Sequence, residues 1–476
     1  MLIEALPKTE ILEFVSPREF GLDRLAEYYQ SCCFAVCEYS LGIKLMCEEL
    51  YHYAFAEAGG CLICRDEYEG VVYFDYPIAK DEKSDVGVAM EAIETYCMEK
   101  DIQLRYTTLP PEVLGEICAR YDGVRMRNTY YCADYLYNAS DIRDFQGKKY
   151  AGQRNHVRRF WRNCPTAKFR PMTSADLPLL ESFFTRFDAG FQKRGADAAQ
   201  EKNAARALLR MGNGSIFRVG CMELEGEIIG VALGEKCGDT LVEHVEKALS
   251  AEYEGIYPAL AQEFVKLFGE DCLYLNREDD ASERGLRISK LQYQPLRIAK
   301  KYDVDIENIL YTISEIPTLK SERLTLDAIR DSDAEPYGAL CLDDERNRFW
   351  GYDYREDLTN PEGADFCRMA SVDFEERRTL SFAVRLHGDL IGEVVLYRFD
   401  NRGSAEIGIR ILPAYSGYGY GREAAQAAMD WALYGLGMTR VCAKCFRENL
   451  PSVKMLSALM KQVREDDRML YFERIV

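Results

Sequence analysis

The sequence predicts a fold of the α/β (α+β) class, built from three modules that each contain a mixed sheet, with the first two modules paired. Residues 323–476 contain a strand hairpin, a third strand, a glycine-rich turn and a helix, in that order. Residues 146–312 follow the same order, and residues 1–145 contain a hairpin and a helix without a comparable glycine turn. Because a chain of 476 residues exceeds one ordinary domain, two to four domains are expected.

The first module, residues 1–145, begins with helical patterns from Leu22 to Cys33 and from Met46 to Ala56. The runs GCLICRDE and GVVYFDYPI are rich in strand-forming residues and are separated by a turn, which predicts a hairpin. We expect a helix from Val86 to Met98 and a closing strand from Tyr130 to Tyr137.

The second module, residues 146–312, begins with a basic helix. We expect its strands from Ile216 to Leu224 and from Ile228 to Gly234, and a helix from Ala259 to Phe268. Residues 313–322 contain Pro317 and are expected to form a short linker. In the third module, residues 323–476, the apolar run from Ile407 to Leu412 predicts a strand and the alanine-rich run from Glu423 to Leu436 predicts a helix. A further strand is expected from Arg440 to Phe446, and Asn449 opens a last helix.

The second and third modules repeat one another at a fixed distance. Gly226 and Gly230 match Gly388 and Gly392, and 388 − 226 = 162. Farther on, Gly255 matches Gly417 at the same offset, and 417 − 255 = 162. The offset also aligns His244 with Glu406. A constant offset across separate blocks indicates a duplication.

Composition excludes several classes of protein. A net charge of −19 disfavours nucleic-acid binding except at a local basic patch. The 17 cysteines are scattered through apolar runs and there are only four histidines, so we predict no metal site and a reduced, cytoplasmic location. The N-terminus lacks the pattern of a signal peptide, and no apolar run is long enough to predict a membrane span.

The turn Ser416-Gly417-Tyr418-Gly419-Tyr420-Gly421-Arg422 lies between a strand and a helix. Glycines allow a tight turn and a close approach of a ligand to the backbone. The start of the helix adds unpaired N–H groups and a partial positive charge. The turn therefore predicts a pyrophosphate site.

This strand, turn and helix resemble the GNAT acyltransferase superfamily, whose motif is Q/R-x-x-G-x-G/A. Ser416, Gly419 and Gly421 stand at the motif positions, with Ser416 in place of the usual Arg or Gln. The start of the module, SERLTLDAIRDSDAEPYGAL, is similar to the ribosomal-protein-type N-acetyltransferases. The resemblance implies acetyl-CoA as co-substrate, and it implies that the following residues bind it: Ile411, Leu412, Ser416, Gly417, Tyr418, Gly419, Tyr420, Gly421, Arg422, Asn449 and Ser452.

Acyl transfer to an amine requires a proton acceptor for the amine and a proton or hydrogen-bond donor for the thiolate. Glu406, on the strand that enters the turn, is the candidate base, although an exposed strand carboxylate with no such role fits the same pattern. Many superfamily members have a tyrosine acid seven residues after the asparagine, where this chain has Leu456. Catalysis would then rest on positioning.

Residues 10–310 resemble the C-terminal domain of phosphatidylglycerol lysyltransferases. The matching segments are FQGKKY with Arg154, HVEKA, YEGIY, NRED, and Gly285-Leu286 with Lys290, Tyr293 and Pro295. That domain is a pair of GNAT-like folds, and family members transfer an aminoacyl group from a charged tRNA. The resemblance therefore implies aminoacyl-tRNA as a possible partner of modules one and two.

Residues 148–162 contain six basic residues and no acidic one. Arg154, Arg158 and Arg162 are spaced to share one helical face, which fits an RNA-end contact or, equally, a solvated helix face. On the expected strand, His244 and Glu246 share a face and could move a proton or only hold the fold. Asn276 and Lys290 are polar candidates for contact with an amino-acid substrate.

The sequence therefore predicts an N-acyltransferase that moves an acetyl group from acetyl-CoA to a primary amine by direct attack. The acceptor is a protein N-terminus or a small amine, and modules one and two are a second, tRNA-dependent site or a recognition scaffold. The alternative is a non-catalytic coenzyme A sensor or scaffold, since Leu456 and Ser416 depart from the motif. The sequence does not indicate the oligomeric state.

Overall fold

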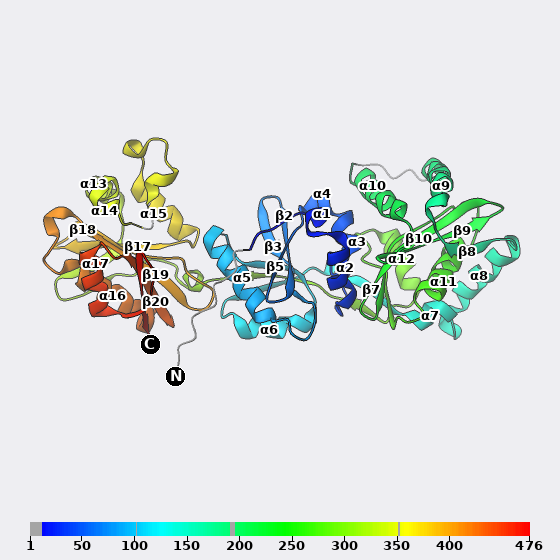
Figure 1. Cartoon of the computed structure of the whole chain (residues 1–476), viewed down its shortest axis with the longest axis horizontal. Coiled ribbons are helices and arrows are strands. Elements are labelled where there is room, and N and C mark those ends of the chain that lie inside the picture. Colours follow the sequence, from blue (N-terminus) through cyan, green and yellow to red (C-terminus); the bar gives the residue numbers. More distant parts are fainter. Residues whose placement is uncertain (1–11, 101, 191–195, 351–352) are drawn as a thin grey trace. The chain divides into compact units, whose positions relative to one another are not determined.

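A computed structural model describes residues 12–100, 102–190, 196–350 and 353–476 (Figure 1). These residues divide into two compact units. Unit 1 contains residues 12–95, 105–115, 126–190 and 196–305, and unit 2 contains residues 96–100, 102–104, 116–125, 306–350 and 353–476. None of the helices in the described residues is both long and apolar enough to cross a membrane.

The fold contains three sheets, and each includes a parallel pair of strands beside antiparallel ones, which confirms the predicted mixed α/β class. The first sheet has the spatial order β1 (Ala54–Ala58), β2 (Cys61–Tyr68), β3 (Val71–Phe74), β5 (Arg105–Leu109), β14 (Tyr302–Ile306) and β6 (Val124–Asn128), and β4 (Ile78–Ala79) pairs with β2. The predicted hairpin is β2 and β3. Part of the helix expected from Met46 to Ala56 is instead strand β1, because Phe55 is buried and this segment pairs with β2.

The second sheet lies in unit 1. Its order is β13 (Arg297–Ala299), β7 (Asp134–Asn138), β12 (Tyr274–Asn276), β11 (Thr240–Ala248), β10 (Glu227–Cys237), β9 (Phe217–Leu224) and β8 (Lys168–Pro171). Strand β7 comes from the segment expected to form module one, and β14 of the first sheet comes from the segment expected to form module two. The two modules therefore exchange strands across the expected boundary at residue 145.

The helices described up to residue 305 vary from one turn to four turns. They are α1 (Pro17–Phe20), α2 (Leu22–Ser31), α3 (Leu41–Met46), α4 (Glu48–Tyr51), α5 (Val86–Lys100), α6 (Leu114–Arg120), α7 (Ala139–Asp144), α8 (Ala151–Asn163), α9 (Leu177–Gly190), α10 (Ala196–Met211), α11 (Ile256–Phe268) and α12 (Arg284–Gln292). Helix α11 buries Ile256, Leu260 and Phe264 in the core beside the second sheet. This packing fixes the position of β11 and its polar side chains.

The third sheet lies in unit 2. Its order is β15 (Leu319–Lys320), β16 (Leu324–Ala328), β17 (Leu380–Leu386), β18 (Asp389–Tyr397), β19 (Ser404–Ile411), β20 (Arg440–Phe446), β22 (Met469–Ile475) and β21 (Lys461–Glu465). Its helices are α13 (Ala334–Leu342), α14 (Asp344–Asn347), α15 (Phe366–Glu375), α16 (Tyr420–Asp430) and α17 (Leu450–Leu459). Helix α16 ends in a π-helical turn over Trp431–Gly435, and its alanines pack into the apolar core of this sheet.

The strand registers support the duplication. In β10 the pairing with β9 skips Ile229, and in β18 the pairing with β17 skips Ile391; 391 − 229 = 162, the offset found in the sequence. A bulge conserved between two copies at one position is a feature of a shared backbone.

The structure shifts the expected alignment of the two glycine turns by two residues. Gly255 begins α11 with φ 86°, and Gly419 begins α16 with φ 86°; 419 − 255 = 164. Gly255 therefore corresponds to Gly419 and not to Gly417. The strand pairing also changes the residue that corresponds to Glu406. Glu406 pairs with Tyr397 and Val242 pairs with Glu235, and Tyr397 and Glu235 are 162 residues apart. Glu406 therefore corresponds to Val242 and not to His244.

Candidate functional site

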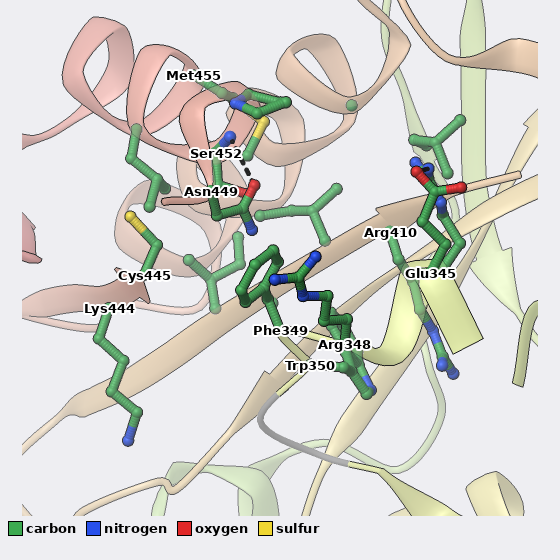
Figure 2. A pocket seen from close by; sticks show the side chains of 18 of the residues that line it. Glu345, Arg348, Phe349, Trp350, Arg410, Lys444, Cys445, Asn449, Ser452 and Met455 are labelled. Atoms are coloured by element: carbon green, nitrogen blue, oxygen red, sulfur yellow. Dashed lines mark hydrogen bonds and ion pairs between the residues drawn. The ribbon is translucent and has the colours of Figure 1, made fainter. Parts of the chain in front are cut away.

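A cleft opens in unit 2 where two parallel strands separate. Strands β19 and β20 pair only from Ser404 to Glu406, opposite Arg440 to Cys442. Beyond this point their facing edges diverge and line a cavity of about 390 Å³ (Figure 2). Backbone groups on these edges lack a strand partner there, so a linear ligand that carries amide groups can bind between them.

The glycine turn lies at the start of α16. Gly417 and Gly419 both have φ 86°, a conformation that favours glycine. The N–H of Glu423 donates to the carbonyl of Gly419 at 3.1 Å, so the N–H groups of Tyr420, Gly421 and Arg422 precede the helical ladder. Apart from its chain neighbours, no heavy atom of the described residues comes within 4 Å of a Cβ built on Gly417, and only Arg323 does so at Gly419. The turn is therefore open to a ligand on its outer side.

The predicted cofactor residues fall into two groups. Ile411, Gly421, Asn449 and Ser452 line the cavity. Leu412, Ser416, Tyr418, Tyr420 and Arg422 belong to the strand end, the turn and the helix start beside it. Asn449 caps α17, because its Oδ1 accepts the backbone N–H of Ser452 at 3.3 Å. Tyr418 is exposed and its ring stacks on that of Tyr420 at 5.9 Å.

Two arginines outside the motif reach the turn. The Nη1 of Arg346 donates to the Oγ of Ser416 at 3.4 Å, and Arg346 also lines the cavity. Arg323 donates to the carbonyl of Tyr418 at 3.1 Å and pairs with Glu423 at 2.7 Å. Ser416 stands where the motif usually has Arg or Gln, and these contacts bring two guanidinium groups to the turn from elsewhere in the chain. The sequence did not single out either arginine, because both lie more than 60 residues before the turn.

One wall of the cavity is formed by Trp350, Gly408 and Arg410. A Cβ on Gly408 would lie 2.8 Å from Cη2 of Trp350, so the indole packs directly on the strand backbone. The guanidinium of Arg410 lies 4.7 Å from the ring centre of Trp350 and pairs with Glu393 at 2.8 Å. This stacked and buried pair gives the cavity a rigid wall, in which Glu393 balances the charge of Arg410.

Glu406 is held by two cations at the point where the strands separate. Its carboxylate lies 3.3 Å from Nη1 of Arg398 and 3.3 Å from Nζ of Lys444. Lys444 and Tyr397 line the cavity, and Glu406 is paired with Tyr397 across the strands. Burial, with Glu406 nearby, raises the pKa of Tyr397, so its hydroxyl stays protonated at neutral pH. Among the described residues that line the cavity, Tyr397 is the one with a phenol.

Leu456 lines the same cavity from α17 and is buried. The position that carries a tyrosine acid in many superfamily members is therefore apolar here. Cys445, on β20, is also buried against this cavity, and burial raises the pKa of its thiol.

In unit 1, His244 is the extra residue of a β-bulge. Strand β10 pairs Leu233 with Val245 and Gly234 with Glu243, which leaves His244 without a partner residue. Its Nε2 lies 2.9 Å from Glu235 and its Nδ1 lies 2.7 Å from Glu278. Burial lowers the pKa of His244, but the hydrogen bonds to the two carboxylates outweigh it and raise the pKa to about 9. His244 is therefore a charged donor at neutral pH and not a free base.

Glu246, expected to work with His244, pairs with Arg277 instead. The Nε of Arg277 donates to Glu243 at 2.5 Å, and its Nη2 donates to Glu246. Burial raises the pKa of Glu246 to about 8, against the attraction of Arg277. The bulge explains this arrangement, because one extra residue resets the strand alternation and brings positions 243 and 246 to one face.

Asn276 and Lys290 have partners within the fold. The Nδ2 of Asn276 donates to Asp134 at 2.8 Å, and its Oδ1 accepts the N–H of Glu278 at 2.7 Å. The Nζ of Lys290 donates to the carbonyl of Arg277 at 2.5 Å. Both side chains thus order the loop after β12, and their predicted contact with substrate stays a prediction.

Cys37, Glu38 and Asp134 are close enough together to resemble a metal site. The ammonium of Lys301 already lies among them, 2.7 Å from Glu38, 2.7 Å from Asp134 and 3.4 Å from the Sγ of Cys37. A buried lysine therefore supplies the positive charge that a metal would otherwise bring. All 17 cysteines are free.

The basic helix is α8. Arg154 turns back to donate to the carbonyl of Gly147 at 2.6 Å, so it caps the preceding loop. Arg158 and Arg162 are exposed. The ring of Trp161 packs against that of Phe160 at 5.1 Å and joins the core. Two of the three predicted arginines are thus available to an anionic partner.

Comparisons with known proteins match both units of the chain. A family model described as phosphatidylglycerol lysyltransferase, C-terminal, matches residues 34–304, and an acetyltransferase (GNAT) domain model matches residues 323–459. A conserved protein of unknown function from Bacteroides thetaiotaomicron is 22% identical, with a TM-score of 0.54, and covers 62% of this chain and 99% of its own; it shows the fold alone.

Curated relatives of the C-terminal part of the chain include proteins named as N-acetyltransferases. The uncharacterized N-acetyltransferase p20 of Bacillus licheniformis is 30% identical over 149 residues, which are 30% of this chain and 82% of that protein. The uncharacterized N-acetyltransferase YoaA of Bacillus subtilis (strain 168) is 26% identical over 143 residues, which are 29% of this chain and 80% of that protein. Since the first family model spans more than half of the chain, this protein belongs to the phosphatidylglycerol lysyltransferase C-terminal family and is an acyltransferase with a second, C-terminal GNAT domain.

Proposed function

We propose that unit 2 transfers an acetyl group from acetyl-CoA to a primary amine by direct attack. The observation that carries this proposal is the cavity between the diverging strands β19 and β20, next to a turn with unpaired N–H groups at a helix start. A cavity of about 390 Å³ suits a small linear group rather than a whole nucleotide. The pyrophosphate would then bind outside, on the turn.

Charge around the turn fits a diphosphate. The exposed Arg422 follows the turn, and Arg346 contacts Ser416 at its start. We assign to Arg346 the phosphate contact that Ser416 cannot make. Asn449 and Ser452 line the cavity on the α17 side, where amide and hydroxyl groups suit the amides of the pantetheine arm (Figure 2).

In the proposed reaction the amine nitrogen attacks the thioester carbonyl, the N–C bond forms and the C–S bond breaks. The amine loses one proton and the leaving thiolate gains one. Glu406 takes the first proton through a bridging water. That water would replace the contact of Glu406 with Arg398 or Lys444. Tyr397, whose phenol is protonated, donates toward the thiolate in place of the absent acid at Leu456. Correct placement of the amine and the thioester accounts for the remaining rate acceleration.

The acceptor is a protein N-terminus or a small amine, and we place the protein in the cytoplasm because its 17 cysteines are free. Thiol release from acetyl-CoA, measured with a panel of peptides and small amines, tests the activity. The expected result is turnover with at least one primary amine and none with its dimethylated form. Tight coenzyme A binding without turnover on any amine would favour a sensor.

A second function is proposed for unit 1, which matches the lysyltransferase family over residues 34–304. There the exposed Arg158 and Arg162 would bind the acceptor end of an aminoacyl-tRNA. The His244 imidazolium would act as a charged hydrogen-bond donor rather than as a base. The test is release of the aminoacyl group from a charged tRNA in the presence of candidate amines or hydroxyl acceptors.

A further inference from the structure

A second cavity opens in unit 2 beside the proposed reaction site. It measures about 460 Å³, and its lining residues lie within 97–99, 102–104, 306–311, 376–379 and 397–401, all of them in unit 2. A volume of this size suits a small molecule or the end of a peptide. The coenzyme A arm is assigned to the cavity between β19 and β20, so this second cavity is left for another ligand.

The two cavities share a wall at the proposed catalytic pair. Tyr397 lines both cavities, and it pairs with Glu406 across β18 and β19. The carboxylate of Glu406 lies 3.3 Å from Arg398, which lines the second cavity, and 3.3 Å from Lys444, which lines the first. A thioester in the first cavity and an amine in the second would therefore approach Glu406 and Tyr397 from two sides.

Positive charge in the second cavity comes from three arginines, Arg377, Arg378 and Arg398. Arg378 is paired with two carboxylates, at 2.7 and 2.8 Å. Arg377 has no carboxylate partner in the described part of the chain. Its Nη1 donates to the carbonyl of Ile313 at 2.7 Å, and its guanidinium lies 5.1 Å from the ring centre of Phe374. An anionic ligand can therefore bind Arg377 without displacing a carboxylate of the protein.

Two of these arginines have a backbone conformation that is unfavourable for a residue with a side chain. Arg377 has φ 63° and Arg398 has φ 51°, in the left-handed region that favours glycine. Arg377 follows the C-cap of α15, where glycine is the usual residue. An arginine in this conformation costs about 1–2 kcal/mol, and residues with such a cost are concentrated at ligand sites.

The cavity also contains a buried hydroxyl group without a partner. Thr379 is 1% exposed and lines the cavity, and its Oγ1 has no hydrogen-bond partner among the described residues. A buried polar atom of this kind is usually satisfied by a bound molecule. The carboxylates of the lining, Glu99 and Glu376, are both exposed, so they leave the buried part of the cavity to cationic and neutral groups.

We propose that the second cavity binds the acceptor, and that Arg377 and Arg398 select a primary amine that carries a carboxylate, as in an amino acid or a short peptide. The proposal rests on acetyl transfer in unit 2, the function proposed above. A guanidinium binds a carboxylate through two parallel hydrogen bonds, which gives both affinity and orientation. The bound carboxylate would hold the amine of the same molecule toward Tyr397 and Glu406.

Acceptor binding would also free the proposed base. Arg398 is bound to Glu406, and the carboxylate of the acceptor would compete with Glu406 for that guanidinium. Once Arg398 turns to the acceptor, an oxygen of Glu406 becomes available to the water that takes the proton of the amine. An acceptor without a carboxylate would leave Arg398 on Glu406. The preference for a carboxylate should therefore appear in turnover as well as in binding.

Acetyl transfer to glycine oligomers of two to four residues, compared with their C-terminal amides, tests the proposal. The two members of each pair share the primary amine and differ in the carboxylate. At least one acid should have a kcat/KM at least about tenfold above that of its amide. Equal values for every pair, in a protein that acetylates them, would overturn the carboxylate site and leave acetyl transfer in place.

Two variants locate the carboxylate. Arg377→Gln and Arg398→Gln should each bring the ratio of acid to amide kcat/KM close to one, and this ratio is insensitive to a general loss of activity. The control is Arg368→Gln, which removes an exposed guanidinium of α15 that pairs with Glu375 at 2.9 Å, and it should keep the native ratio. A native ratio in both cavity variants would overturn the site. A thermal melt of each variant checks the fold.

Isothermal titration of the whole chain with the same acids and amides separates this site from the proposed function. If no amine is acetylated, the function of unit 2 fails, but tighter binding of an acid than of its amide, lost in Arg377→Gln and Arg398→Gln, would still support the carboxylate site. Equal binding of acid and amide in every pair would overturn it.

Discussion

Alanine at Gly419 or Gly417 tests whether the glycine turn binds a diphosphate. Both residues have φ 86°, and the space where a methyl group would lie is open. The nearest atom at Gly419 is Nη2 of Arg323, at the ordinary contact distance of 3.6 Å. The substitutions therefore meet no steric obstacle in the free protein and carry only the backbone cost of an alanine at positive φ, about 1–2 kcal/mol.

The predicted effect on binding is larger than the effect on stability. For a unit of this size, 1–2 kcal/mol lowers the melting temperature by about 2–8 °C. A methyl group on the turn would hold a phosphate away from N–H groups such as that of Gly421. Each charge-assisted hydrogen bond lost costs about 1.5–3 kcal/mol, so coenzyme A affinity should fall by at least about tenfold. Isothermal titration with coenzyme A gives the affinity, and a thermal melt gives the stability.

Gly437 supplies a matched control. It has φ 88°, a Cβ there would also meet no atom within 4 Å, and it follows the π-helical turn rather than the glycine turn. Gly437→Ala should lose similar stability and keep the coenzyme A affinity of the native chain. If Gly417→Ala and Gly419→Ala bind coenzyme A as well as Gly437→Ala does, the turn is not the phosphate site and the proposed cofactor residues are wrong.

Four further predictions follow from named contacts. Tyr397→Phe should lower kcat at least about tenfold while KM for acetyl-CoA stays near its native value, because the phenol is assigned to the leaving thiolate; an unchanged kcat removes that role. Gly42→Ala places a methyl 2.4 Å from Nε2 of the buried His244, so a thermal melt should report a loss of about 1–3 kcal/mol in unit 1, and an unchanged melt would refute this packing. Because its folded pKa is about 9 and its unfolded value is about 6.5, His244 should stabilise the fold fully below pH 6.5 and lose that effect as pH rises through 9; a pH–stability profile that His244→Gln leaves unaltered would contradict it. Charge reversal of Arg158 and Arg162 to Glu should weaken binding of a tRNA acceptor stem at least about tenfold and flatten its salt dependence, and equal binding by filter assay would refute the RNA contact.

The local pattern was enough to predict the elements that position the unit 2 site. Strand β20 spans Arg440–Phe446 as expected, and the glycine turn precedes a helix, because apolar periodicity and glycine placement act within a few residues. The expected helix over Met46 to Ala56 was wrong in its second half. There the pairing of β1 with β2 outweighs the local preference, and that pairing depends on a segment the local pattern does not include.

The side chains that complete each site could not be predicted from short segments of the sequence. Arg346 reaches Ser416, and Tyr397 faces the cavity, only because distant strands and loops meet in the fold. The expected partnership of His244 and Glu246 assumed a regular strand, and the bulge at His244 broke the alternation on which it rested. A bulge is set by the register between two strands, so one strand's sequence gives little sign of it.

In both units a parallel strand pair separates at a corresponding point, but different residues lie beyond that point. Parallel pairing ends at Val242 opposite Asn276 in unit 1 and at Glu406 opposite Cys442 in unit 2; 406 − 242 = 164, the offset of the helix starts. Past this point unit 1 places Glu243, His244 and Arg277, joined in buried ion pairs, whereas unit 2 has Gly408 and a cavity of about 390 Å³. We therefore propose coenzyme A binding only for the copy with the open cavity, beside β19 and β20.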